Sequence, residues 1–262
     1  MGMPNRDALN QQNELAEFLF NQTFGRTLKV QSHIWALQHY MACGYPAALQ
    51  TTLGQTEQVA KQHLMRPDFG TDEQRRPYLE NLESYVRDAA LDTMQIAHAT
   101  AEASCVVFAH SMLDAAVLDY CRVSAMMNVE DWRPWVEEDK FTLRQLGESD
   151  PSGLLVEAIE GFMKKLNNKS LLNKIETLQS VCKPGSAEIR KNYQFDGARI
   201  RSIDDLRHAI VHKDAFGSRI QNATDDLEYL WQTNLYLSQL VTHRYSLLLN
   251  SNALSFADRP IL

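Results

Sequence analysis

Apolar residues recur at intervals of three and four along most of this chain, and this spacing constrains the fold more than any other feature of the sequence. Between positions 106 and 120 the steps are four, three, four and three, through Val106, His110, Leu113, Val117 and Tyr120. Such steps place side chains on one face of an α-helix, whereas the side chains of a β-strand alternate with a period of two. No segment of the sequence shows sustained alternation of that kind. The sequence therefore predicts an all-α protein in which helices pack on helices.

The first seventy residues are expected to form a helical extension. The ranges 7–24 and 28–42 have helical spacing and are divided by Gly25. The range 44–70 is expected to be a loop with one short helical piece, because prolines and glycines interrupt it. The interrupting residues are Pro46, Gly54, Pro67 and Gly70. We place a domain boundary here.

A long helical pattern then runs from Thr71 to about Met127. Thr71 followed by Glu73 is typical of a helix start. The pattern is too long for one ordinary globular helix, so we expect a break near 99–103 that produces two antiparallel helices.

Four further helices are expected in the second half of the chain, after an irregular stretch between 132 and 147. One of them extends from about Ala198 to Val211. The apolar stripes of the other three are Leu155, Ile159, Phe162 and Leu166; Leu171, Ile175, Leu178 and Cys182; and Leu230, Leu237, Val241 and Leu248. The predicted organisation is an N-terminal helical extension over residues 1–70, an antiparallel helical bundle over 71–250, and a C-terminal tail over 251–262.

Composition favours a cytoplasmic protein without a membrane segment. The best apolar candidate, 105–109, stops at His110, far short of the roughly 20 residues that a membrane span needs. Residues 1–10 are polar and lack the apolar core of a signal peptide. The cysteines argue against both a disulfide framework and a zinc ribbon, because they are far apart and form no Cys-x-x-Cys pair. They are Cys43, Cys105, Cys121 and Cys182.

Neither a metal ion nor a cofactor is expected. His33 and His39 lie six residues apart in one predicted helix, which is not a ligand spacing, and no carboxylate pair is near them. The sequence contains no Gly-rich phosphate loop and no Gly-x-Ser-x-Gly nucleophile motif.

Charge is distributed unevenly along the chain. The formal net charge is -7, which works against non-specific attraction to nucleic acid. The segment from Lys183 to Arg219, however, contains eight basic and five acidic residues, so it carries +3 while the rest of the chain carries -10. One locally cationic segment thus lies in an acidic protein.

The predicted helix from about Ala198 lies in this cationic segment, and its two faces differ in kind. At about 100° per residue, one face is apolar and must point to the core, and the opposite face collects four polar residues within about 60°. The apolar residues are Ile200, Ile203, Leu206 and Ile210, and the polar ones are Arg201, Asp205, His208 and His212, with Arg207 on the shoulder of the apolar set. Arginine offers a permanent charge with planar donors, and histidine can exchange a proton near neutral pH, so the polar row suits a phosphate. The alternative is an ordinary solvated helix face.

The string Leu206-Arg207-His208-Ala209-Ile210-Val211-His212 resembles the signature of the HEPN superfamily, which has an Arg, a polar neighbour and a His after four to six residues. Here the spacing is four and the polar neighbour is His208. Arg201 and His208 also satisfy the spacing, but Arg207 and His212 have the polar neighbour and the helix end that follows. The ranges 170–175 and 108–120 are similar to the helix before the motif and to the second core helix, with Asp114 where members often have Glu. The resemblance covers residues 71–250.

This resemblance implies a HEPN-type helical bundle acting as a metal-independent endoribonuclease, often a toxin or phage-defence effector. Active members are typically homodimers in which two motifs share one cleft. Arg207 and His212 would be catalytic, with Arg207 holding the phosphate and His212 transferring protons. His208, Arg201 and Lys213 would contact the substrate. The 2′-hydroxyl of RNA would attack the adjacent phosphate, leaving a 2′,3′-cyclic phosphate.

A second interpretation is kept open: a HEPN-like module that binds a partner protein or a nucleotide without catalysis. In an intermediate case, residues 1–70 or a partner, an antitoxin or regulatory protein, would mask an active site. Two other features are expected to be structural. His110, on an apolar stripe, is expected to be a satisfied interior or interface histidine. The aromatic cluster of Trp132, Trp135 and Phe141 is expected to pack under a loop, with base stacking as the alternative.

Overall fold

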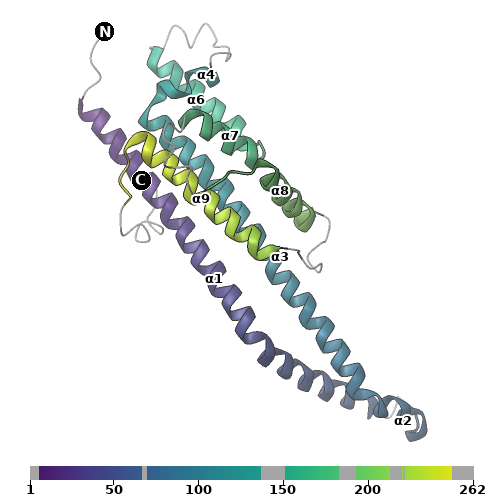
Figure 1. Ribbon diagram of the computed structural model, residues 1–262. Helices are drawn as coiled ribbons and strands as arrows, with labels where there is room; N and C mark the ends of the chain where they lie inside the picture. The colour runs from purple at the N-terminus through teal and green to yellow at the C-terminus, as the bar shows by residue number, and fades with distance from the viewer. Residues whose placement is uncertain are drawn as a thin grey trace. The chain divides into compact units, whose positions relative to one another are not determined.

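The computed structural model describes residues 6–66, 70–136, 151–182, 193–212, 220 and 222–249. These residues are helical apart from short turns and connections, and they include no β-strand, so the all-α prediction is confirmed (Figure 1). The elements in chain order are α1 (Arg6–Leu64), α2 (Asp72–Glu80), α3 (Leu82–Met127), the 3-10 helix η2 (Val129–Trp132), α4 (Arg133–Val136), α6 (Pro151–Asn167), α7 (Leu171–Cys182), α8 (Gly197–His212) and α9 (Ala223–Tyr245). The expected tail, 251–262, lies outside the described residues.

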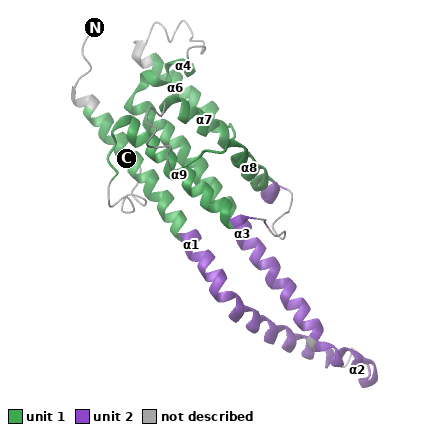
Figure 2. Ribbon diagram, in the orientation of Figure 1, with its two compact units in different colours: residues 1–32, 106–208, 224–262 green, residues 33–105, 209–223 purple. Residues whose placement is uncertain are grey.

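The chain folds into two compact units, shown in Figure 2. Unit 1 comprises residues 1–32, 106–208 and 224–262, and unit 2 comprises residues 33–105 and 209–223. The first part of α1, up to residue 32, belongs to unit 1. The division between units also falls within α8, after His208.

The first helix is one uninterrupted element, so the predicted division at Gly25 is wrong, and the predicted loop is wrong over residues 44–64. α1 continues through Gly25, Pro46 and Gly54 to Leu64. A glycine inside a helix costs about 1 kcal/mol relative to alanine, and proline costs about 3 kcal/mol. Burial of neighbouring side chains such as Phe24 and Thr27 offsets the cost at Gly25.

The predicted break near 99–103 is also wrong, since α3 is continuous from Leu82 to Met127. That range contains no glycine or proline, and only the length of the pattern suggested a break. The turn lies earlier, at Gly70 and at Asn81. Gly70 has a φ of +112°, a conformation that favours glycine, and the Gln74 side chain accepts a hydrogen bond from the Thr71 backbone N–H at 2.9 Å to begin α2.

The core of unit 1 consists of aromatic and aliphatic side chains from several helices. Phe20 of α1 lies against Tyr120 of α3, with ring centroids 5.7 Å apart. Trp132 is fully buried, packs on Phe162 of α6 and donates from Nε1 to Ser124 Oγ at 3.0 Å. The other large buried side chains of this core include Leu113, Ile175, Leu178, Ile200, Ile203, Leu230 and Leu237.

A buried polar chain connects three helices of unit 1. Tyr120 donates from its hydroxyl to Asn234 Oδ1 at 3.2 Å, and Asn234 donates from Nδ2 to Thr27 Oγ1 at 3.1 Å. Thr27 in turn donates to the Phe24 carbonyl at 2.8 Å. Because buried polar groups are costly when unpaired, these bonds select one register of α1, α3 and α9.

Unit 2 is built mainly from the second part of α1 and the first part of α3, joined through α2. Its apolar cluster brings Leu64 of α1 against Leu82 and Val86 of α3, with Leu53 and Ala60 packed on it. Large hydrophobic side chains also remain exposed in this unit, including Trp35, Tyr40, Val59, Tyr78, Tyr85 and Ile96.

Among the described residues, α3 is the one helix whose length and composition satisfy the test for a membrane span. The apolar window within 84–127 has a mean hydropathy of 1.4, and half of it is buried inside the protein. The sequence analysis had not predicted a membrane-spanning segment here. A core helix of a folded domain passes the same test, and such burial is typical of one.

Candidate functional site

The side chains of α8 are positioned by a capped and anchored start. Asp196 accepts hydrogen bonds at Oδ1 from the backbone N–H groups of Ala198 (2.9 Å) and Arg199 (3.2 Å), which are otherwise unpaired at a helix N-terminus. The Tyr229 hydroxyl of α9 accepts from the Asp196 backbone N–H at 2.8 Å and donates to its carbonyl at 3.0 Å. Burial of Ile200 and Ile203 then sets the rotation of the helix.

A polar cavity of about 440 Å³ lies within unit 1, between α3, α7, α8 and the turn that joins α6 to α7. Asp204 and Arg207 enter it from α8, His110 and Asp114 from α3, and Lys174 from α7. We call this the α3–α8 cavity. Its charged lining comprises the cations Arg122, Lys169, Lys174 and Arg207 and the carboxylates Asp114, Asp119 and Asp204.

A histidine that is hydrogen-bonded to a carboxylate lines one side of the α3–α8 cavity. His110 is 6% exposed, and its Nε2 lies 2.9 Å from Asp204 Oδ1. Burial lowers the pKa of His110, an effect that the nearby Asp204 and Asp114 only partly offset and that Arg207 reinforces. The imidazole is therefore neutral near pH 7. Since Asp204 accepts the Nε2 proton, Nδ1 is the nitrogen that can take up a proton.

An ion pair between Lys174 and Asp114 also lines the α3–α8 cavity. Lys174 is 2% exposed, and its Nζ donates to both carboxylate oxygens of Asp114, at 2.6 and 2.8 Å. A lysine so fully buried stays charged only with a close partner. The pair holds α7 to α3 along the cavity wall.

Arg207 brings a buried donor without a partner to this cavity. Its Nε is buried and has no hydrogen-bond partner among the described residues. The carboxylates around it are already engaged: Asp204 with His110, Asp114 with Lys174, and Asp119 with Arg122 at 2.7 Å. An unpaired guanidinium donor in a polar cavity is suited to binding an anion.

The other residues expected at the site lie differently. Arg201, His208 and His212 are exposed on α8, and none of them lines the α3–α8 cavity. Residues five apart on a helix point about 140° away from each other, which explains why Arg207 and His212 do not share this cavity. Lys213 lies outside the described residues.

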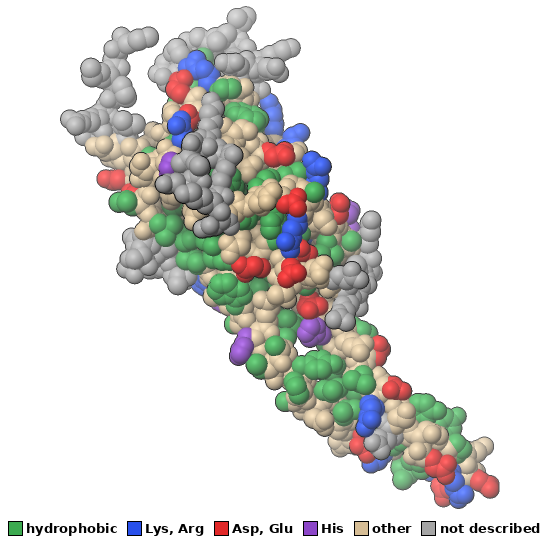
Figure 3. Space-filling view, viewed as in Figure 1, with side chains coloured by type: hydrophobic (Ala, Val, Ile, Leu, Met, Phe, Trp, Pro, Cys, Tyr) green, Lys and Arg blue, Asp and Glu red, His purple; other side chains and the backbone are tan. Residues whose placement is uncertain are grey.

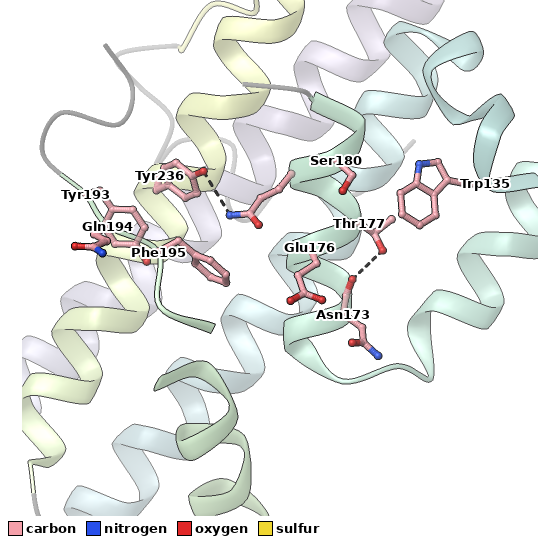
Figure 4. Close-up of a pocket in the computed structure, with 10 residues that line it drawn as sticks. Trp135, Asn173, Glu176, Thr177, Ser180, Tyr193, Gln194, Phe195 and Tyr236 are labelled. Atoms are coloured by element: carbon pink, nitrogen blue, oxygen red, sulfur yellow. Dashed lines mark hydrogen bonds between the residues drawn. The ribbon is translucent and has the colours of Figure 1, made fainter. Parts of the chain in front are cut away.

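A larger cavity, of about 1030 Å³, lies along α7 in unit 1. Figure 4 shows Trp135 at one end of it and Tyr193 and Tyr236 at the other, with α7 side chains such as Glu176 between. Tyr193 stacks on Tyr236 with centroids 4.8 Å apart, and the Tyr236 hydroxyl accepts from Gln179 Nε2 at 3.4 Å.

The two tryptophans of the predicted aromatic cluster lie in different environments. Trp132 is fully buried in the core, whereas Trp135 is 38% exposed and lines the larger cavity while its ring lies 6.0 Å from that of Phe162. Phe141 lies outside the described residues.

Charges of both signs are interspersed on the surface. On the face shown in Figure 3, the Lys and Arg side chains lie among acidic and hydrophobic ones and do not gather into one basic area. This agrees with a net charge of -7. A polyanion would thus be held by individual local sites on this face, because the face offers no broad electrostatic attraction.

Sequence reasoning missed that His110, Lys174 and Asp204 belong to one site. His110 was expected to be a satisfied interior histidine, and the structure shows it buried and hydrogen-bonded, but also at a cavity wall. A usable signal was present in the spacing: Asp114 follows His110 by four residues and Arg207 follows Asp204 by three, so each pair shares a helix face.

Comparison with models of protein families, with curated protein sequences and with solved structures finds no match to this chain. The resemblance to HEPN proteins therefore depends on the motif and on the order of helices around it.

Proposed function

We propose that this protein is a metal-independent endoribonuclease that engages the RNA backbone through α8. The observation that carries the proposal is the buried, unpartnered Arg207 Nε in a polar cavity whose carboxylates are already bonded. A phosphodiester supplies the acceptor oxygens that this donor lacks. Arg207 would stabilise the charge that develops on those oxygens in the transition state.

His212 supplies proton transfer in this proposal. Its exposed position at the end of α8 leaves it accessible to substrate. Because Arg207 and His212 point about 140° apart on their helix, we propose that the complete site combines motifs of two protomers related by a two-fold axis. Arg201, His208 and Lys213 would contact flanking phosphates.

The test is incubation of the purified chain with a mixed-sequence RNA in EDTA. Wild type should cleave RNA and leave a 2′,3′-cyclic phosphate, and the analogous DNA should survive because it lacks the 2′-hydroxyl. Arg207→Ala and His212→Ala should each lose about 10²-fold or more in rate. Arg87→Ala, an exposed arginine of α3, serves as the matched control and should cleave like wild type.

Mixing the two inactive variants tests the composite site. After subunit exchange, half of the dimers are heterodimers with one intact site of two, so about a quarter of wild-type activity should return. No recovery despite verified exchange would contradict the shared site. Full activity of Arg207→Ala, or no RNA cleavage by folded, dimeric wild type, would overturn the nuclease and favour the module that binds a protein or nucleotide without catalysis.

A further inference from the structure

The histidine of the α3–α8 cavity lies outside the Arg-His motif, yet it has the surroundings of a proton-transfer group. His110 comes from α3, and its partner Asp204 lies on α8 three residues before Arg207. All three side chains line the same cavity of about 440 Å³. An imidazole, the carboxylate that orients it and a guanidinium whose buried Nε has no partner are thereby brought together within one protomer.

The hydrogen bond to Asp204 determines what His110 can do. A carboxylate that accepts the Nε2 proton fixes the tautomer, holds the ring in place and stabilises the cation that forms when Nδ1 is protonated. The groups around the imidazole are Asp204 and Arg207 on α8, Asp114 on α3 and Lys174 on α7. Lys174 is neutralised by its own bonds to Asp114. The neutral form is thus favoured at rest, as a general base requires.

We propose that His110 is a second catalytic residue, the general base of the proposed ribonuclease, and that Asp204 is its positioning residue. This inference rests on the proposed function. The 2′-hydroxyl proton passes to His110 Nδ1 as O2′ forms its bond to phosphorus. The bond from phosphorus to O5′ then breaks, and His212 of the second protomer donates a proton to the leaving O5′. The products are a 2′,3′-cyclic phosphate and a 5′-hydroxyl, and Arg207 contacts the non-bridging oxygens throughout.

The roles of the two histidines can be separated by changing the leaving group. A uridine 3′-(4-nitrophenyl phosphate) has a leaving group that departs without protonation, so it needs the base but not the acid. The rate of His212→Ala should therefore be close to the wild-type rate on this substrate, although it is far below the wild-type rate on RNA. His110→Gln should remain about 10²-fold or more below wild type on both substrates. His98→Gln, which alters a partly exposed histidine on the same helix, is the matched control and should behave as wild type.

The pH dependence gives a readout that a purely structural role would not move. The wild-type rate should fall on the acid side as His110 becomes protonated. Asp204→Asn removes a carboxylate that raises the pKa of His110, so its acid limb should move to lower pH while the maximal rate falls. This variant also keeps the test open if His110→Gln does not fold, as judged by circular dichroism.

The outcomes separate the two proposals. Wild type inactive on both RNA and the nitrophenyl ester would overturn the proposed function itself. Active wild type with a folded His110→Gln as fast as His98→Gln would overturn only the role of His110. Rescue of His110→Gln by the activated leaving group would also overturn it, since that result would make His110 the acid.

Discussion

His110 Nε2 lies 2.9 Å from Asp204 Oδ1, which joins the middle of α3 to α8 one turn before Arg207. Because of this bond, the groups around Arg207 come from two helices, α3 and α8, that are distant in sequence. Its consequences for stability and chemistry can be measured even before a substrate is known.

The stability of the protein should depend on the protonation of His110. Its pKa is lowered in the folded state, mainly by burial, so below about pH 6.5 the unfolded chain binds a proton that the folded chain does not. The contribution of His110 to the free energy of unfolding is therefore constant above that pH and is lost as the pH falls toward the folded-state pKa. Urea denaturation at a series of pH values from 7.5 to 5.5 would measure it (about one unit on either side of 6.5).

The comparison for that series is His110→Gln, which has no group that titrates in this range. Its free energy of unfolding should fall less steeply between neutral and mildly acidic pH than that of wild type. Identical slopes would show that the folded state accepts the His110 proton as readily as the unfolded chain.

The two members of the Lys174–Asp114 pair should not be equivalent. Lys174 is 2% exposed, whereas the Asp114 side chain is 33% exposed. Asp114→Ala leaves a buried ammonium without a partner and should cost about 3–5 kcal/mol, and Lys174→Met leaves a carboxylate that water reaches and should cost roughly half as much. Chemical denaturation at neutral pH measures both, with the exposed Lys164→Met as a control expected within about 0.5 kcal/mol of wild type. A larger loss for Lys174→Met would contradict this account.

Two glycines of unit 2 should respond to alanine in opposite directions. Gly54 lies inside α1, and a Cβ added there would meet open space, so Gly54→Ala should stabilise by about 0.5–1 kcal/mol. Gly70 has a φ of +112°, and a Cβ there would lie 2.5 Å from Gln74 Oε1. That oxygen accepts the hydrogen bond from the Thr71 backbone N–H at the start of α2. Gly70→Ala should destabilise by at least about 1 kcal/mol. Thermal unfolding of the two variants measures both effects. Stabilisation by both substitutions would contradict the turn described at Gly70.

One cysteine in four should react rapidly in the native protein. Cys43 is exposed, whereas Cys105, Cys121 and Cys182 are buried. Burial raises the pKa of Cys121 and of Cys105, and raises that of Cys182 to about 12, so these thiols are both inaccessible and protonated. Titration with a chromogenic disulfide should detect one thiol per chain in buffer and four in denaturant, and Cys43→Ser should abolish the native signal. More than one fast thiol would contradict this packing.

Prediction succeeded where the information is local. The stripe that begins at Leu171 and ends at Cys182 lies on α7, and the helix expected from about Ala198 to Val211 is α8 within one residue at each end. Both are marked by apolar stripes with helical spacing. Prediction was wrong for α1 and α3 because glycine, proline and length are weak local signals, and a buried helix face outweighs a penalty of a few kcal/mol.

The candidate site divides in the same way. Sequence alone determined that the protein is helical, that Ile200 and Ile203 face a core, and that Arg207 and His212 occupy different sides of one helix, because these follow from 3.6 residues per turn. Only the tertiary structure decided that Asp204 meets His110, 94 positions away, and that Asp114 meets Lys174, 60 positions away. Such pairs depend on the crossing of whole helices, which is set by the sum of many packing contacts rather than by any short pattern.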